Sequence, residues 1–189
     1  MSMKIIKKNS ENLIIINKSK FIGIVNKINT KEEALELLDT IKEKHPLATH
    51  ICYAYILPNL EKYSDDGEPD GTAGLPILDV LKKNNLCYII AIVVRYFGGI
   101  KLGSNGLIRA YSNTISALIN DNIKEAVNGY IISIIDDYSN SKQLDYLLRN
   151  DEIISKEYLD KIIIKAIVKK KTLENLSNVN YQIISEIII

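Results

Sequence analysis

The sequence contains the run LCYIIAIVVRYFGGIKLGSNG at residues 86–106. Its first part, residues 86–94, is apolar at every position, which is typical of a β-strand that is covered on both faces. Residues 97–106 are rich in glycine and predict a loop. Apolar residues then recur at helical spacing from Leu107 to Leu118 and predict a helix. The run therefore predicts a central strand that leads through a glycine-rich loop into a helix.

The segments before this run predict further elements around the central strand. Segments with the composition of strands lie at residues 13–16, 21–28 and 49–57. Thr30 and Glu33 have the spacing of a capping box, and the apolar stripe behind them predicts a helix that ends before Pro46. A polar loop and a short helix are predicted at residues 58–74 and 75–83.

The second half of the chain predicts a separate small domain. Asn128 and Gly129 are a turn signal, so we place the domains at residues 1–128 and 129–189. Strands are predicted at residues 130–135, 152–158, 161–168 and 181–189, and helices at residues 142–150 and 172–178. The order βαββαβ is that of a ferredoxin-like domain, with two helices on one face of an antiparallel sheet. The fold class is therefore α+β, in two domains.

The composition is that of a globular protein without a strong global charge. Of 189 residues, 47% are hydrophobic and 25% charged, and the formal net charge is +1. Binding to a polyanion would therefore need a local basic patch. The apolar run is shorter than the roughly 20 residues that span a bilayer, and the N-terminus lacks the apolar part of a secretory signal. Cys52 and Cys87 are predicted to be buried free thiols. We expect a cytoplasmic protein with no cofactor and no membrane partner.

An acidic loop is the first segment that can carry chemistry. Asp65, Asp66, Glu68 and Asp70 lie among glycines, and hard cations prefer such oxygen ligands. The spacing matches no named metal motif, and the same residue types also form ordinary tight turns. We therefore assign no metal. Asp65, Asp66 and Glu68 are the residues that a metal or an acid–base site would use.

The glycine-rich loop predicts an anion-binding site. A strand that passes through glycines into a helix presents backbone amides and a positive helix terminus to an anion. The residues expected to contribute are Arg95, Gly98, Gly99, Lys101, Gly103, Ser104 and Arg109. Ser104 and Asn105 stand where a nucleotide P-loop needs Lys and then Ser or Thr, so the loop is not a P-loop. Alternatively, the glycines serve only a turn with positive φ and close helix–strand contact.

Arg95 needs an explanation because it ends an otherwise apolar strand. Such a charge has to emerge at the rim of the sheet or be paired. The partners that we consider are Asp65, Asp66 and Glu68.

The segment HPLATHIC at residues 45–52 contains both histidines and one cysteine. Its spacing fits no common zinc finger. A Cys–His nucleophilic pair is a second reading, with His50 as the catalytic candidate. On a strand, His50 and Cys52 project from the same face, and we expect them to be structural residues.

These segments together resemble the IMPACT family, specifically its bacterial YigZ branch. The matching pieces are SKFI at residues 19–22, HPLATHIC at 45–52, SDDGEP at 64–69, GTAG at 71–74, VRYFGG at 94–99 and LG at 102–103. The resemblance covers nearly the whole chain. One departure is Ser104-Asn105, where related chains are often richer in Thr and Gly.

The resemblance implies an N-terminal α/β unit with the left-handed βαβ crossover of elongation factor G domain IV. It also implies a C-terminal ferredoxin-like domain similar to domain V of that factor. Eukaryotic relatives regulate translation by interfering with the activation of an initiation-factor kinase, and they use an additional N-terminal domain for this. The chain has no room for that domain, so the resemblance implies a link to RNA or the ribosome and not kinase regulation.

Three functions remain open at this point. The first is a translation-linked protein that binds RNA or the ribosome through the glycine-rich basic loop. The second is an enzyme, a metal-assisted hydrolase or transferase that uses the acidic loop beside Arg95 on a small phosphorylated or acyl substrate. The third is an adaptor that binds a protein partner at exposed β-edges. The absence of a recognised catalytic motif favours the first over the second.

Overall fold

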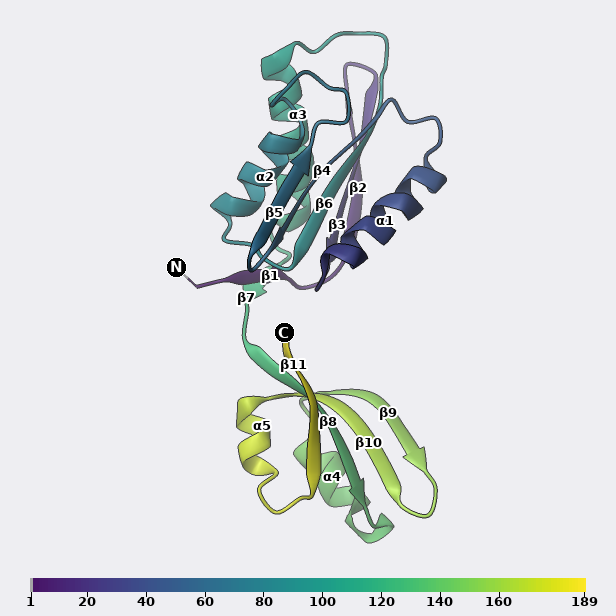
Figure 1. Cartoon of the computed structure of the whole chain (residues 1–189), viewed down its shortest axis with the longest axis vertical. Coiled ribbons are helices and arrows are strands. Elements are labelled where there is room, and N and C mark those ends of the chain that lie inside the picture. The colour runs from purple at the N-terminus through teal and green to yellow at the C-terminus, as the bar shows by residue number, and fades with distance from the viewer. Residues whose placement is uncertain (1) are drawn as a thin grey trace. The chain divides into compact units, whose positions relative to one another are not determined.

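The structure of the protein is a computed structural model that describes residues 2–189. Its contacts divide the chain into two compact units, and the boundary along the chain lies between Glu125 and Ala126. Figure 1 shows both units, and each is described here by itself. The boundary predicted after residue 128 falls at the beginning of strand β8 (Asn128–Asp136), close to the one that the contacts give.

A five-stranded antiparallel sheet forms the centre of the first unit. Its strands lie in the order β2 (Ser10–Ile16), β3 (Ser19–Lys27), β6 (Ile89–Tyr96), β4 (His50–Leu57) and β5 (Leu60–Ser64). The prediction of a central strand is confirmed, because β6 pairs with β3 on one side and with β4 on the other. The strand begins later than predicted, since Tyr88 has a positive φ of 56° that breaks the extended backbone.

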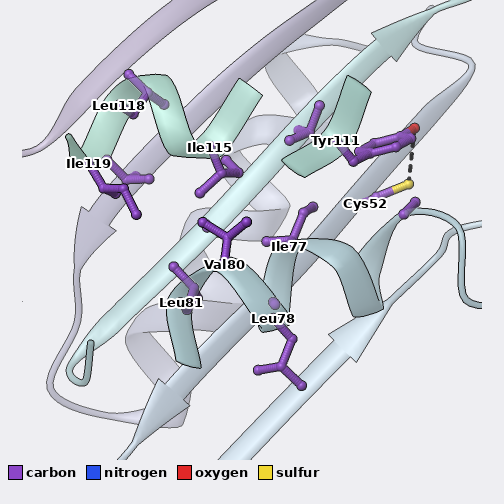
Figure 2. Packing of buried hydrophobic residues seen from close by; sticks show 14 of the residues in the cluster. Cys52, Ile77, Leu78, Val80, Leu81, Tyr111, Ile115, Leu118 and Ile119 are labelled. Atoms are coloured by element: carbon purple, nitrogen blue, oxygen red, sulfur yellow. Dashed lines mark hydrogen bonds between the residues drawn. The ribbon is translucent and has the colours of Figure 1, made fainter. Parts of the chain in front are cut away.

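Helices cover both faces of this sheet (Figure 1). Alternate residues of β6 point to opposite faces, as a strand requires. Ile89, Ala91 and Val93 pack against α2 (Gly74–Lys83) and α3 (Ser104–Ile119). Ile90, Ile92 and Val94 pack against α1 (Lys31–Lys44). Figure 2 shows how α2 and α3 contribute Ile77, Leu81, Ile115 and Ile119 to the first of these cores. The continuous apolar run is thus explained by burial on both faces.

Helix α1 begins at the predicted capping box and links two parallel strands. The Thr30 hydroxyl accepts a hydrogen bond from the Glu33 amide at 3.2 Å, while the Glu33 carboxylate accepts one from the amide of Asn29 and not of Thr30. The helix ends at His45, before Pro46. It joins β3 to β4, which are parallel to each other because both run antiparallel to β6.

Three short strands were not predicted from the sequence. Residues 58–74 were expected to form only a loop, yet β5 pairs with β4 at the edge of the sheet. Its residues are mostly exposed, so the alternation of apolar and polar positions is missing. β1 (Lys4–Ile6) and β7 (Ile123–Glu125) form a separate antiparallel pair.

The second unit has the predicted βαββαβ order. Its elements are β8, the 3₁₀ turn η1 (Tyr138–Asn140), α4 (Ser141–Leu147), β9 (Glu152–Tyr158), β10 (Ile162–Lys169), α5 (Lys170–Asn175) and β11 (Tyr181–Ile188). The antiparallel sheet has the order β11-β8-β10-β9, which is the ferredoxin-like arrangement. Its core contains Ile132, Ile134, Leu144, Leu148, Ile164 and Leu176. The α+β fold class is confirmed. Among the described helices of either unit, none has the length and apolarity to cross a membrane.

Candidate functional site

A cleft of about 410 Å³ lies at the end of β6 in the first unit. It brings together three segments that are far apart in the sequence: residues 45–52, the acidic loop and the glycine-rich loop. His50 comes from the start of β4, Glu68 from the acidic loop, and Arg95 from the end of β6. The glycine-rich loop and the start of α3 supply Phe97, Lys101, Leu102, Gly103, Ser104 and Leu107.

Arg95 and Glu68 form an ion pair at the base of this cleft. Nη1 of Arg95 lies 2.5 Å from Oε1 of Glu68, and the two residues are 4% and 8% exposed. The same carboxylate oxygen accepts a hydrogen bond from the Tyr111 hydroxyl at 2.7 Å. Of the two outcomes expected for Arg95, emergence at the rim of the sheet or pairing, the structure shows pairing, and of the three acidic residues considered, Glu68 is the partner. A buried charge needs such a partner because it has lost its hydration.

Aromatic rings enclose the guanidinium group of Arg95. Its Cζ lies 5.3 Å from the ring centroid of Phe21 and 5.5 Å from that of Phe97, which are cation–π distances. Its Nη2 is 3.5 Å from the Ser19 hydroxyl, and its Nε is buried without a hydrogen-bond partner among the described residues. Arg95 is therefore a component of the cleft's base, not a side chain free in solvent.

Asp65 has a structural task in the acidic loop. Its carboxylate accepts hydrogen bonds from the backbone amides of Gly71, Ala73 and Gly74, at 2.9, 2.9 and 2.8 Å. Helix α2 begins at Gly74 and its N-cap residue, Ala73, has no side chain that can cap it. Asp65 thus supplies the acceptor for the first amides of α2, where negative charge is favourable.

The carboxylates of Asp66 and Glu68 bind partners that differ from those of the Asp65 carboxylate. The Asp66 carboxylate accepts from the amide of Ile51 at 2.6 Å, and Glu68 is used by Arg95 and Tyr111. The reversal at Asp66 and Gly67, which both have positive φ, separates the three side chains. Within residues 2–189, no group of three His, Cys, Asp or Glu side chains is arranged to hold a metal ion.

His50 and Cys52 lie on the same face of β4, but only His50 reaches the cleft. Nδ1 of His50 is 2.8 Å from the carbonyl oxygen of Asp66, so Nδ1 carries the proton and donates it there. Nε2 then faces Glu68, at 3.8 Å from its Oε2. The expected structural role of His50 therefore applies to its Nδ1 atom, whereas Nε2 faces Glu68.

Cys52 is a core residue. Its thiol lies 3.0 Å from the carbonyl oxygen of Asp65 and 3.4 Å from the hydroxyl of Tyr111, the contact that is dashed in Figure 2. Burial raises the pKa of Cys52 to about 12, and the neighbouring Glu68 and Asp66 charges add to this effect. Burial also raises the pKa of Tyr111. Both groups are neutral at physiological pH, so Cys52 is not an activated nucleophile.

The glycine-rich loop is fixed to the turn between β2 and β3. The amide of Gly98 donates to the Ser19 hydroxyl at 3.1 Å, and a Cβ at Gly98 would lie 2.1 Å from the carbonyl carbon of Lys18. On the other side, the amide of Phe97 donates to the Thr49 hydroxyl at 2.9 Å. Close backbone approach therefore requires glycine at position 98.

Helix α3 begins inside the segment that was predicted to be loop. Its first residue is Ser104, because Gly103 takes the N-cap position with a φ of 70°. Gly103 has no side chain with which to cap the helix. The amides of the first turn are thus left without a side-chain acceptor, and Gly103 and Ser104 both line the cleft.

The structure gathers some of the predicted anion-binding residues and leaves others apart. Lys101 is exposed at the cleft and forms no ion pair with any residue in the described part of the chain. Gly98 and Gly99 shape the loop behind it without lining the cleft, and Gly99 has a φ of 85°. Arg109 is exposed on α3 and is not one of the lining residues.

Comparison with known proteins identifies the family. Residues 17–119 match the Impact N-terminal domain, and this segment contains the whole cleft. The chain belongs to the IMPACT family. IMPACT family member YvyE of Bacillus subtilis is 40% identical over 172 residues, covering 88% of this chain and 79% of its own length. IMPACT family member YigZ of Escherichia coli is 40% identical over 106 residues, covering 53% of this chain and 52% of its own.

The IMPACT fold is also shared by a solved structure. A crystal structure described as that of a hypothetical protein has a TM-score of 0.62 and 27% identity, over 97% of both chains. The expected resemblance to the IMPACT family and its YigZ branch is therefore confirmed. In this IMPACT protein, the cleft lies in the part of the chain that defines the family.

Proposed function

We propose that this chain is a cytoplasmic RNA- or ribosome-associated protein linked to translation or its regulation, and that it binds RNA phosphates in the cleft. The observation that carries the proposal is that Lys101, which forms no ion pair within residues 2–189, lies close to the uncapped start of helix α3. Lys101 and the first turn of α3 border the same hollow. A phosphate bound there is held by backbone amides, by the positive end of α3, and by the lysine charge.

The buried groups support this binding site indirectly. Arg95 is neutralised by Glu68 and has little exposed surface, so it braces the base of the cleft and does not take up a phosphate by itself. Among the described residues, Glu68 is the single acidic one that lines the cleft. Its charge is compensated by Arg95, so it repels a bound anion less than a free carboxylate would.

The link to translation rests on the family. The resemblance to IMPACT proteins associates this fold with the regulation of translation in eukaryotes, and it implies a likeness of the two units to two domains of elongation factor G. The near-neutral net charge of +1 counts against tight non-specific binding of nucleic acid. A local site for a few phosphates is compatible with that charge.

Co-sedimentation with ribosomes tests this proposal. We expect the wild-type protein to sediment with ribosomes at about 50 mM salt and to be released at higher salt, because phosphate contacts displace counterions. Lys101→Ala is expected to lower the bound fraction. Lys62→Ala is the matched control, since Lys62 is an exposed lysine on β5 that does not line the cleft. Equal binding by both variants contradicts the proposed site, and no binding by wild type at low salt contradicts the function.

A second candidate function is acid–base catalysis by His50 on a small phosphorylated ligand. One observation favours it. The Asp66 carbonyl binds Nδ1 of His50 and so orients the imidazole with Nε2 toward Glu68 at the cleft. His50→Gln separates the two functions. It abolishes hydrolysis of a phosphate-ester library by the wild-type protein if the cleft is catalytic, whereas a wild-type protein that hydrolyses none of these esters contradicts the catalytic function and leaves the binding function standing.

A further inference from the structure

A second hollow, of about 420 Å³, lies on the opposite face of the sheet at the same end of β6. Its lining includes Lys18, Lys20, His45 and Tyr96. Phe97 lines this hollow and also the cleft described above. One aromatic residue therefore stands between two hollows that open on different faces of the same sheet.

The position of Phe97 follows from the alternation of β6. Arg95 points to the face covered by α3, and Tyr96 points to the face covered by α1, where Lys20 is its neighbour on β3. Phe97 is the first residue beyond β6, so neither helix covers it and 46% of its surface is exposed. Figure 1 shows that α1 and α3 lie on opposite sides of the sheet at the end of β6.

Basic side chains lie on both sides of this aromatic residue. Lys18 and Lys20 line the second hollow and Lys101 lines the cleft, and all of them are exposed. Across residues 2–189, no acidic side chain forms an ion pair with any of the three. The second hollow has no acidic lining residue, and the cleft has only Glu68, which Arg95 neutralises. The rim formed by Lys18, Lys20, Phe97 and Lys101 is called the basic rim below.

The backbone around Phe97 is held in place before any ligand binds. The hydroxyls of Thr49 and Ser19 accept hydrogen bonds from the amides of Phe97 and Gly98. Behind the ring, the guanidinium of Arg95 lies 5.5 Å from its centroid and is itself fixed by Glu68. Ordering an exposed aromatic ring costs conformational entropy, and this cost is smaller where the backbone is already fixed.

From these observations we infer that the basic rim binds single-stranded RNA, with one unpaired base stacked on Phe97. The phosphate on one side of that base contacts Lys101 and the start of α3, and the phosphate on the other side contacts Lys18 or Lys20. The inference rests on the proposed function and specifies its ligand. A base of a duplex is stacked between its neighbours and does not reach a protruding ring, whereas a base of a single strand does.

The test uses fluorescence anisotropy at about 50 mM salt. It measures the affinity of the full chain for a fluorescein-labelled oligouridylate of ten nucleotides and for an RNA duplex of the same length. Wild type is expected to bind the single strand more tightly. Phe97→Leu is expected to weaken that binding roughly 5- to 100-fold, as the loss of one base–aromatic stack does. Phe97→Tyr keeps the ring and is expected to retain binding. Tyr63→Leu is the matched control, because Tyr63 is 42% exposed on β5 but lines neither hollow.

Two results overturn the inference and leave the proposed function standing. The first is equal or tighter binding of the duplex, and the second is an affinity of Phe97→Leu that equals that of Tyr63→Leu. A Lys18→Ala and Lys20→Ala double variant adds an independent readout. It removes the one phosphate contact on the second face and is expected to reduce the magnitude of the slope of log affinity against log salt by about 0.7. An unchanged slope contradicts contacts on the second face. A wild-type protein that binds no RNA at this salt contradicts the proposed function itself.

Discussion

Nη1 of Arg95 and Oε1 of Glu68 lie 2.5 Å apart in the interior of the first unit, and this ion pair ties the end of β6 to the acidic loop. The pair also sets the position of two neighbours, because Tyr111 donates to Glu68 and the ring of Phe97 lies over the guanidinium of Arg95. The base of the cleft is therefore a hydrogen-bonded cluster whose members come from distant parts of the sequence. Removing one charge of such a pair leaves the other buried without compensation.

Glu68→Gln should destabilise the protein by about 3–5 kcal/mol, since Arg95 then remains as an unpaired buried cation. Urea unfolding monitored by circular dichroism measures the change. The double variant Glu68→Gln, Arg95→Met removes both charges and should recover a large part of the lost stability. A double variant that is less stable than wild type by the sum of the effects of Glu68→Gln and Arg95→Met would show that the two residues are not coupled.

Asp65→Ala should cost about 2–4 kcal/mol of unfolding free energy, because three amides at the start of α2 lose a charged acceptor. Asp70→Ala is the control in the same loop and should change stability by less than about 0.5 kcal/mol, since Asp70 is exposed. Thermal unfolding with and without Mg²⁺ separates this role from metal binding. A Mg²⁺-dependent rise of the melting temperature that Asp65→Ala abolishes would argue for an ion site.

Cys52 should make stability depend on pH in the alkaline range. Its pKa is raised from 9.0 to about 12 in the folded protein, so the unfolded chain loses the thiol proton first. Stability from this group is complete below pH 9 and declines as the pH rises from 9 toward 12. The decline should be smaller in Cys52→Ala but still present, because burial also raises the pKa values of Tyr111 and Cys87. Cys52→Ala should also lose about 1 kcal/mol or more at neutral pH through the cavity left in the core.

Thiol labelling provides a separate check of the same burial. Neither Cys52 nor Cys87 should react with iodoacetamide in the native protein at pH 8, and both should react in urea. Burial raises the pKa of Cys87 as well. Rapid native labelling of Cys52 would contradict the packing of the first core, and rapid labelling of Cys87 would contradict its burial.

Residues 1–125 and 126–189, expressed separately, should each fold, because each has its own sheet and its own apolar core. The second fragment is the less stable one, since so small a domain buries a smaller fraction of its surface. Cooperative thermal unfolding of each fragment is the readout. If both fragments are unstructured while the full chain is folded, the two-domain division is wrong.

Most of the fold could be predicted because its signals are local. The apolar run that contains β6, the capping box of Thr30 and Glu33, and the βαββαβ order all follow from residue type and spacing. β5 was missed because an exposed edge strand of polar residues has no apolar period to detect. The start of α3 was misplaced because it depends on the positive φ of Gly103, which the sequence does not specify.

The site could be predicted only in part. The need for a partner to Arg95 follows from one charge at the end of an apolar strand. The choice of Glu68 does not, because it depends on the reversal at Asp66 and Gly67. Tyr111 lies within the helix predicted from Leu107 to Leu118, and a hydroxyl among apolar residues at helical spacing is a signal of a buried polar partner. The roles of Ser19 and Thr49 arise from contacts between distant segments and had no local signal.

The salt dependence of single-stranded RNA binding tests the central claim, a phosphate site formed by Lys101 and the start of α3, most directly. Affinities for oligouridylate are measured between about 50 and 200 mM salt for wild type, Lys101→Ala and the control Lys62→Ala. The account predicts that Lys101→Ala binds more weakly and that its log–log slope is smaller in magnitude than that of wild type by about 0.7, with Lys62→Ala unchanged. Slopes and affinities of Lys101→Ala that equal those of wild type would contradict it.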